Sequence, residues 1–228
     1  MLKKRIIFTL LYDNGSFMLS RNFRLQKVGT IGWLQKNYDF SQIASYIDEL
    51  IVLDVSRAER DICHFSDALK VLAKGCFAPI AAGGGIRTLS DARQLLRSGA
   101  DKLVVNSVLF DDPQFVSTLA QEFGRQCVVG AIDIKQEVDG TYHVHTNNGS
   151  CERHELVTKL LEQLPEKSVG ELYLNSINQD GTGQGYDFGL LDLIPCQLNL
   201  PTILAGGAGH SQHLINGLLD ERVDAVAT

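Results

Sequence analysis

Short apolar runs alternate with amphipathic segments along the chain. Strands are predicted at runs such as IIFTLL (6–11), IVLDV (51–55) and CVVGAIDI (127–134), which are rich in β-branched residues. Between such runs apolar residues recur at helical spacing, as in 60–75 and 88–99. Near-continuous apolar strands separated by helices are typical of a parallel sheet that is covered on both faces.

This alternation predicts a single (βα)8 TIM-barrel domain over residues 1–228, because eight strand–helix units form that fold. After the first strand we expect a long loop and then a helix over 40–50. The chain stops at the eighth strand, so the last helix is expected to be absent from it. The remaining strands are predicted at 79–85, 102–107, 172–176, 202–207 and 224–228, and further helices at 111–124 and 154–164.

Two helix starts are marked chemically. Thr88 with Asp91 three residues later predicts a capping box, and Asp112 before Pro113 predicts an N-cap followed by a first-turn proline. No Pro/Ser-rich linker interrupts the pattern, which favours one domain over two.

The two halves of the chain align without gaps at a shift of 122 residues. DELIVLD (48–54) lies over GELYLNS (170–176), and GGG (83–85) lies over AGG (205–207). The half-repeats cover about 1–122 and 123–228. A doubled half-barrel predicts paired sites on one face, at the carboxyl ends of the strands.

The two glycine-rich strand ends favour a substrate with a phosphate at each end, since backbone N–H groups there can approach an anion closely. Glycines that only serve tight turns are the alternative. By the same symmetry, paired carboxylates are expected at the tips of strands one and five. The chain has Asp133 at one tip and Leu11 at the equivalent position.

Composition narrows the classes of partner. A formal net charge of −6 argues against nucleic acid or an anionic membrane as the main partner. No apolar run is long enough to span a bilayer, and the five cysteines show no C-x-x-C spacing, so we expect a soluble cytoplasmic protein. No cofactor is expected.

Asp139-Gly140 lies between two alternating segments and predicts a hairpin inserted over about 135–150. His143 and His145 on this hairpin point to one face. Two histidines without a nearby third ligand are more typical of an exposed face, so no metal site is expected.

A series of motifs across the whole chain resembles the HisF family, the cyclase subunit of imidazole glycerol phosphate synthase. The motifs are, in order, LKKRII, VLDVS, GGGIR, GADKLVVNS, AIDIK, SINQDGTGQGYD and AGGAG. The sister isomerase of the histidine pathway shares the half-barrel repeat, but DGTGQGYD and the inserted hairpin are similar to the cyclase. The resemblance implies a HisH-type glutaminase as partner. Its ammonia would enter at the bottom of the barrel and reach a bisphosphorylated ribonucleotide at the top.

The resemblance also implies roles for individual residues. Asp133 matches the general acid or base on strand five, and Asp101 matches a residue turned toward the glutaminase. The charged positions around the ammonia entrance, or gate, are Arg5, Glu49, Lys102 and Glu171. The positions that match phosphate contacts are Gly85, Asn106 and Ser107 for one site, and Asp180, Gly181 and Gly207 for the other. An ordinary salt-bridge cluster at the barrel base is the alternative for the charged positions.

The departures from the family pattern lie in the first unit. Leu11 stands where the family has its other catalytic aspartate, and Leu19 where it has a lysine on a loop over the substrate. Asn22 and Phe23 on that loop do match. Asp13 is two residues beyond Leu11 and is expected to lie beyond the barrel tip.

We consider three candidate functions. In the first, the chain is an additional, HisF-like paralogue that passes ammonia from a glutaminase to another acceptor. Such copies are associated with sugar amidation in surface-polysaccharide (lipopolysaccharide) biosynthesis, together with a sugar amidotransferase. The second is a working imidazole glycerol phosphate synthase cyclase, a lyase of histidine biosynthesis. The third is a phosphosugar-binding barrel without a glutaminase.

Overall fold

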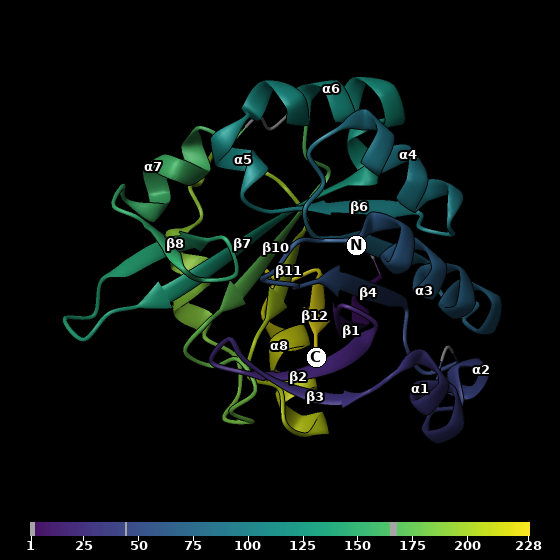
Figure 1. Ribbon diagram of the computed structural model, residues 1–228. Helices are drawn as coiled ribbons and strands as arrows, with labels where there is room; N and C mark the ends of the chain where they lie inside the picture. Colours follow the sequence, from purple (N-terminus) through teal and green to yellow (C-terminus); the bar gives the residue numbers. More distant parts are fainter. Residues whose placement is uncertain (1–2, 44, 165–167) are drawn as a thin grey trace.

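Within residues 3–43, 45–164 and 168–228, which the computed structural model describes, eight parallel strands close into a barrel (Figure 1). The predicted (βα)8 fold is therefore confirmed. Around the barrel the strands are β1 (Arg5–Asp13), β4 (Glu49–Asp54), β5 (Ile80–Gly83), β6 (Lys102–Val105), β7 (Val128–Gln136), β10 (Glu171–Ser176), β11 (Thr202–Ala205) and β12 (Ala225–Ala227), which pairs with β1 again.

Helices cover the outside of the barrel (Figure 1). They are α3 (Ile62–Gly75), α4 (Leu89–Arg97), α5 (Val108–Asp111), α6 (Pro113–Phe123), α7 (Val157–Glu162) and α8 (Ser211–Leu219), with 3-10 segments η1 (Arg125–Cys127) and η2 (Phe188–Leu193). The predicted capping box of α4 is confirmed, because Thr88 and Asp91 exchange both hydrogen bonds. Asp112 caps α6 by accepting from the Phe115 N–H. None of the helices in the described ranges is long and apolar enough to cross a membrane.

Side chains alternate between the barrel interior and the helix layer. Inward positions form one apolar cluster, which includes Ile7, Ile51, Val129 and Ala131. The intervening positions, such as Leu50, pack against the helices in a second, larger cluster. Since both faces of every strand are covered, the strands are apolar almost without interruption.

The first strand–helix connection differs from its prediction. The expected long loop holds an antiparallel hairpin, β2 (Ser16–Arg21) and β3 (Arg24–Gly29), followed by α1 (Ile31–Asn37). Asn22 and Phe23 form its turn with φ of 49° and 62°, as a type I′ hairpin turn requires. The helix predicted over 40–50 is also wrong, because α2 covers only Phe40–Ile43 and β4 begins at Glu49. Residue 44 lies outside the described residues.

A second hairpin extends from β7. That strand continues past the barrel wall and pairs antiparallel with β8 (Tyr142–Thr146), which pairs with β9 (Cys151–Arg153). The hairpin projects from the barrel in Figure 1. The prediction of an exposed histidine face is wrong for His145, which is only 6% exposed. His145 has register partners on both sides, Asp133 on β7 and Glu152 on β9, which a single strand's pattern does not reveal.

Candidate functional site at the barrel mouth

A cavity of about 610 Å³ lies at the carboxyl ends of the barrel strands. The inward strand tips contribute Leu11, Leu53, Asn106, Asp133 and Asn175 to its lining, and the β2–β3 hairpin covers part of it. In this fold the carboxyl-end face is where active sites are built.

Asp133, on β7, brings a carboxylate into the lining of this cavity. Its two carboxylate oxygens accept from the Asn175 Nδ2 group at 2.9 Å and from the Asn106 Nδ2 group at 3.1 Å. Burial raises the pKa of Asp133 to about 6, against the opposing effect of these two hydrogen bonds. A carboxyl group with such a pKa can give or take a proton near neutral pH.

Leu11 lies across the barrel from Asp133. β1 and β7 are four strands apart in either direction around the barrel, so their tips are opposite each other. Leu11 shares its inward face with the core residue Ile7 and lines the cavity. A hydrocarbon group therefore faces the carboxylate.

Two other carboxylates near the rim of the cavity, Asp54 and Asp13, do not take the position opposite Asp133. Asp54 ends β4, the strand beside β1, one residue beyond inward Leu53. It accepts from the Ser56 N–H at 2.9 Å, and its pKa is raised by burial. Asp13 ends β1 and accepts from the Asn14 Nδ2 group at 3.2 Å, outside the cavity lining.

The two glycine-rich strand ends lie on opposite sides of the mouth, because β5 and β11 are also four strands apart. Gly84 and Gly207 both have φ of 111°. A Cβ atom would lie 2.2 Å from the Asp54 carbonyl oxygen at Gly84, and 2.0 Å from the Gly185 carbonyl oxygen at Gly207. Close backbone packing thus requires glycine here whether or not a phosphate binds.

Arginines join the first glycine cluster, and the sequence analysis missed them. Arg57 and Arg60 follow β4 and line the cavity beside Gly85, whose added Cβ would meet Arg60 Cδ at 2.7 Å. The guanidinium groups could neutralise a phosphate bound at this end. The signal was present in SRAER, which follows the VLDV strand directly. Ser107 is partly engaged, since its Oγ accepts from the Asn147 N–H at 3.1 Å.

Two predicted residues of the second phosphate site, Asp180 and Gly181, contact the β2–β3 hairpin. Asp180 Oδ2 accepts from the Phe23 N–H at 3.0 Å and from the Ser20 hydroxyl. Gly181 has φ of 65°, and a Cβ there would lie 1.9 Å from the Ser20 carbonyl oxygen. The turn of the hairpin is thus held against the loop that follows β10.

Further contacts fix the hairpin on both sides of the mouth. The Asn22 side chain donates to the Asn178 carbonyl at 2.7 Å, and Arg57 donates to the Phe23 carbonyl at 2.6 Å. Leu19 on the hairpin lines the cavity and is 63% exposed. The hairpin therefore offers a hydrocarbon group at this position.

The opposite end of the barrel carries a closed ring of charges. Arg5 donates to Glu49 at 2.8 Å and to Glu171, and Lys102 donates to Glu49 at 3.0 Å and to Glu171 at 3.1 Å. Both carboxylates are almost fully buried. Two cations and two anions alternate around the axis, and the inward apolar cluster lies between this ring and Asp133.

Asp101 lies beside the ring and is exposed. Its Oδ2 atom accepts from the Ile80 N–H at 2.8 Å, where β5 begins. Asp48 does the same for the Ile6 N–H at 2.9 Å. A structural role thus accounts for the Asp101 side chain, and its role at a glutaminase interface stays a prediction.

Comparisons with known proteins agree with this arrangement. A family model described as "Histidine biosynthesis protein" matches residues 35–228. A Parasynechococcus marenigrum protein, provisionally named imidazole glycerol phosphate synthase subunit hisF2, is 46% identical over 228 residues, which is 100% of this chain and 84% of the relative. The chain belongs to the HisF family.

Other relatives of this HisF-family chain are named imidazole glycerol phosphate synthase subunit HisF, without a provisional qualifier. The imidazole glycerol phosphate synthase subunit HisF of Exiguobacterium sp. is 36% identical over 99% of this chain and 86% of its own length. That of Hydrogenobaculum sp. is 40% identical over 74% of this chain and 67% of its own length.

Proposed function

We propose that this HisF-family chain is an ammonia-receiving barrel subunit that serves an acceptor reaction other than the normal cyclisation. A HisH-type glutaminase would dock at the charged ring. The acceptor would be a sugar amidated in surface-polysaccharide biosynthesis, with a sugar amidotransferase as a further partner. The observation that carries the proposal is Leu11 facing Asp133 across the mouth, above an intact ring at the base.

The barrel interior suits a small neutral molecule. Between the ring and the mouth the inward side chains are mostly apolar, and several of them are alanines. A charged ammonium ion would lose most of its hydration among these side chains, whereas neutral ammonia would lose far less.

The mouth supports only part of an acid–base mechanism. A reaction that needs one group to donate a proton while another accepts one requires two titratable groups near the reacting atoms. Asp133 can fill one role, and Leu11 can fill neither. The two glycine-rich ends and Arg60 still suit a substrate that carries phosphate.

An authentic imidazole glycerol phosphate synthase cyclase is the second candidate. The subunit names of the relatives favour it, as do the closed ring and the retained Asp133. A phosphosugar-binding barrel without a glutaminase is the third candidate, for which the glycine-rich ends suffice.

Steady-state turnover of the bisphosphorylated ribonucleotide with ammonium salts separates the first two candidates. We expect a rate at least about 100-fold below that of a HisF relative, because one acid–base group is missing. Leu11→Asp should raise the rate, while the matched variant Leu11→Asn, which is similar in size but not acidic, should not. A family-level rate in the unmodified protein would refute the proposal.

Glutaminase coupling separates the third candidate from the others. We expect this chain to co-purify with a HisH-type glutaminase and to stimulate its hydrolysis of glutamine. Transfer of the released ammonia to a nucleotide-linked sugar, in the presence of a sugar amidotransferase, would support the specific acceptor. If the chain neither binds the glutaminase nor stimulates it, the phosphosugar-binding function remains.

A further inference from the structure

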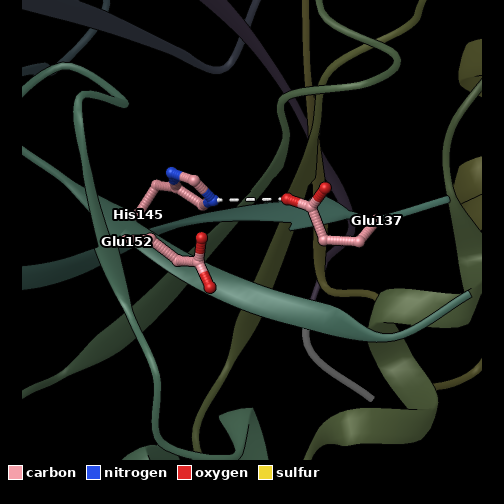
Figure 2. Close-up of side chains that lie close together, drawn as sticks. All are labelled: Glu137, His145 and Glu152. Atoms are coloured by element: carbon pink, nitrogen blue, oxygen red, sulfur yellow. Dashed lines mark ion pairs between the residues drawn. The ribbon is translucent and has the colours of Figure 1, made fainter. Parts of the chain in front are cut away.

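Three potential metal ligands converge on the second hairpin, and one of them, His145, is the register partner of Asp133. Figure 2 shows Glu137 beyond the end of β7, His145 on β8 and Glu152 on β9 with their side chains turned toward one another. Their ligand atoms all lie within 4.8 Å of each other. His145 and Glu152 are register partners in the β8–β9 pair, so they lie on the same face of the sheet.

His145 is prepared for coordination by its second ring nitrogen. Its Nδ1 atom lies 3.1 Å from the Gly149 carbonyl oxygen, which can only accept a hydrogen bond. The proton of a neutral ring is therefore on Nδ1, and Nε2 carries a lone pair. Metal-binding histidines typically show this arrangement, in which a backbone carbonyl fixes the ring.

The lone pair of His145 Nε2 has no partner of its own. The residue is 6% exposed, and Nε2 is buried without a hydrogen bond. It lies 4.0 Å from Glu137 Oε1, too far for a hydrogen bond (dashed line in Figure 2). His145 Nε2 is thus a buried acceptor beside two carboxylates, and no positive charge of the described residues lies between these three groups.

A lysine compensates one of the two carboxylates, and two further histidines lie beside the other. Lys135 Nζ lies 2.7 Å from Glu137 Oε1, and it lowers the pKa of that carboxyl group. His143 and His154 each place Nδ1 3.3 Å from Glu152 Oε1. None of these groups bonds to His145 Nε2.

We propose that His145, Glu137 and Glu152 bind a first-row divalent transition-metal ion such as Zn²⁺. One imidazole nitrogen and two carboxylate oxygens are suitable ligands, and a fourth position stays open to water or His143. Tetrahedral zinc with bonds of about 2.0–2.1 Å places its ligand atoms about 3.3 Å apart. Small rotations of the two glutamate side chains would bring the ligand atoms, which now lie within 4.8 Å of one another, to that separation.

The ion would also brace the turn that borders the cavity. Gly149, whose carbonyl fixes the His145 ring, belongs to the turn 147–149. Asn147 in this turn donates to Ser107 Oγ at 3.1 Å, and Asn148 donates to the Val55 carbonyl at 3.3 Å. Binding on the hairpin would therefore stiffen one rim of the mouth, whichever acceptor the barrel serves.

Calorimetric titration of metal-free protein with Zn²⁺ tests the site. Thiols also bind zinc, so the experiment uses a parent protein with Cys63→Ser, Cys151→Ser and Cys196→Ser, which removes the three exposed thiols. We expect one ion per chain, with affinity reduced at least tenfold in Glu152→Gln and His145→Gln. His64→Gln, which changes an exposed histidine elsewhere, should bind as the parent does.

Co²⁺ supplies a second measurement on the same proteins. Its visible spectrum should indicate nitrogen and oxygen ligands without thiolate charge-transfer absorption, and Glu152→Gln should abolish that spectrum. Glu152 lies on the surface, so its variant should keep the parent's circular dichroism. Absence of binding in the parent, or equal affinity in the parent and both site variants, would overturn the proposal.

Discussion

Asp133→Asn removes an ionisable group from the barrel mouth and keeps the shape of the side chain. Burial raises the pKa of Asp133 from 3.8 to about 6. One pKa unit corresponds to about 1.4 kcal/mol, so ionisation of Asp133 in the folded protein costs at most about 3 kcal/mol. We expect about 2 kcal/mol, because the carboxylate borders a cavity that water can enter.

The sign of the pH dependence follows from the direction of the shift. Between pH 3.8 and about 6 the folded protein binds more protons at Asp133 than the unfolded chain does. The free energy of unfolding of the natural protein should therefore fall, relative to that of Asp133→Asn, as the pH rises from about 4 to about 7. Above about pH 7 the difference should become constant.

A constant offset between the two proteins is also expected. The amide that replaces the carboxylate in Asp133→Asn has one acceptor oxygen, whereas both Asn106 and Asn175 donate to Asp133. One donor then loses its partner or its amide must flip, at a cost of about 1–3 kcal/mol. This cost does not depend on pH, so the change of the difference with pH isolates the ionisation.

Urea unfolding at several pH values between about 4.5 and 7.5 measures the difference. Asp67→Asn is a flat control, because the hydrogen bond from Lys70 lowers the pKa of that exposed carboxyl group below its usual value of 3.8. The stabilisation from Asp67 is fully present above that unfolded pKa and is lost only below it, so the difference for this variant should stay nearly constant across the range. A difference for Asp133→Asn that stays flat across the range would refute the assignment of a raised pKa.

Further predictions concern the other parts of the site. Leu11→Asp should raise the pKa of Asp133 further by like-charge repulsion. Carboxyl NMR titration would measure this pKa, and an unchanged value would mean that the two strand tips do not interact. Glu171→Gln should destabilise the fold by about 2 kcal/mol in urea unfolding, because Arg5 and Lys102 would share only Glu49; no change would speak against an energetic role of the ring. Gly181→Ala should speed proteolysis of the β2–β3 hairpin, since its Cβ would clash with the Ser20 carbonyl. Gly140→Ala has similar backbone strain but no clash, so equal cleavage of the two variants would contradict the role of that contact.

The sequence determined much of the barrel. Strand and helix periods are local properties, so apolar runs and amphipathic segments located most elements. The 122-residue repeat paired the two glycine-rich ends and placed Leu11 over Asp133. The elements that local patterns misjudged are the hairpin 16–29, whose turn needs φ above zero at Asn22 and Phe23, and the short helix that ends at Ile43.

Only the tertiary structure decided which side chains meet. The ring joins Arg5 to Glu171 because the barrel closes between β12 and β1, and no local pattern encodes that closure. In the same way, His145 is buried because β7 and β9 flank its strand, and the hairpin turn at Phe23 is held by Asp180 from the far half of the chain. Periodicity says which face a residue takes, whereas its partners follow from how distant strands and loops pack together.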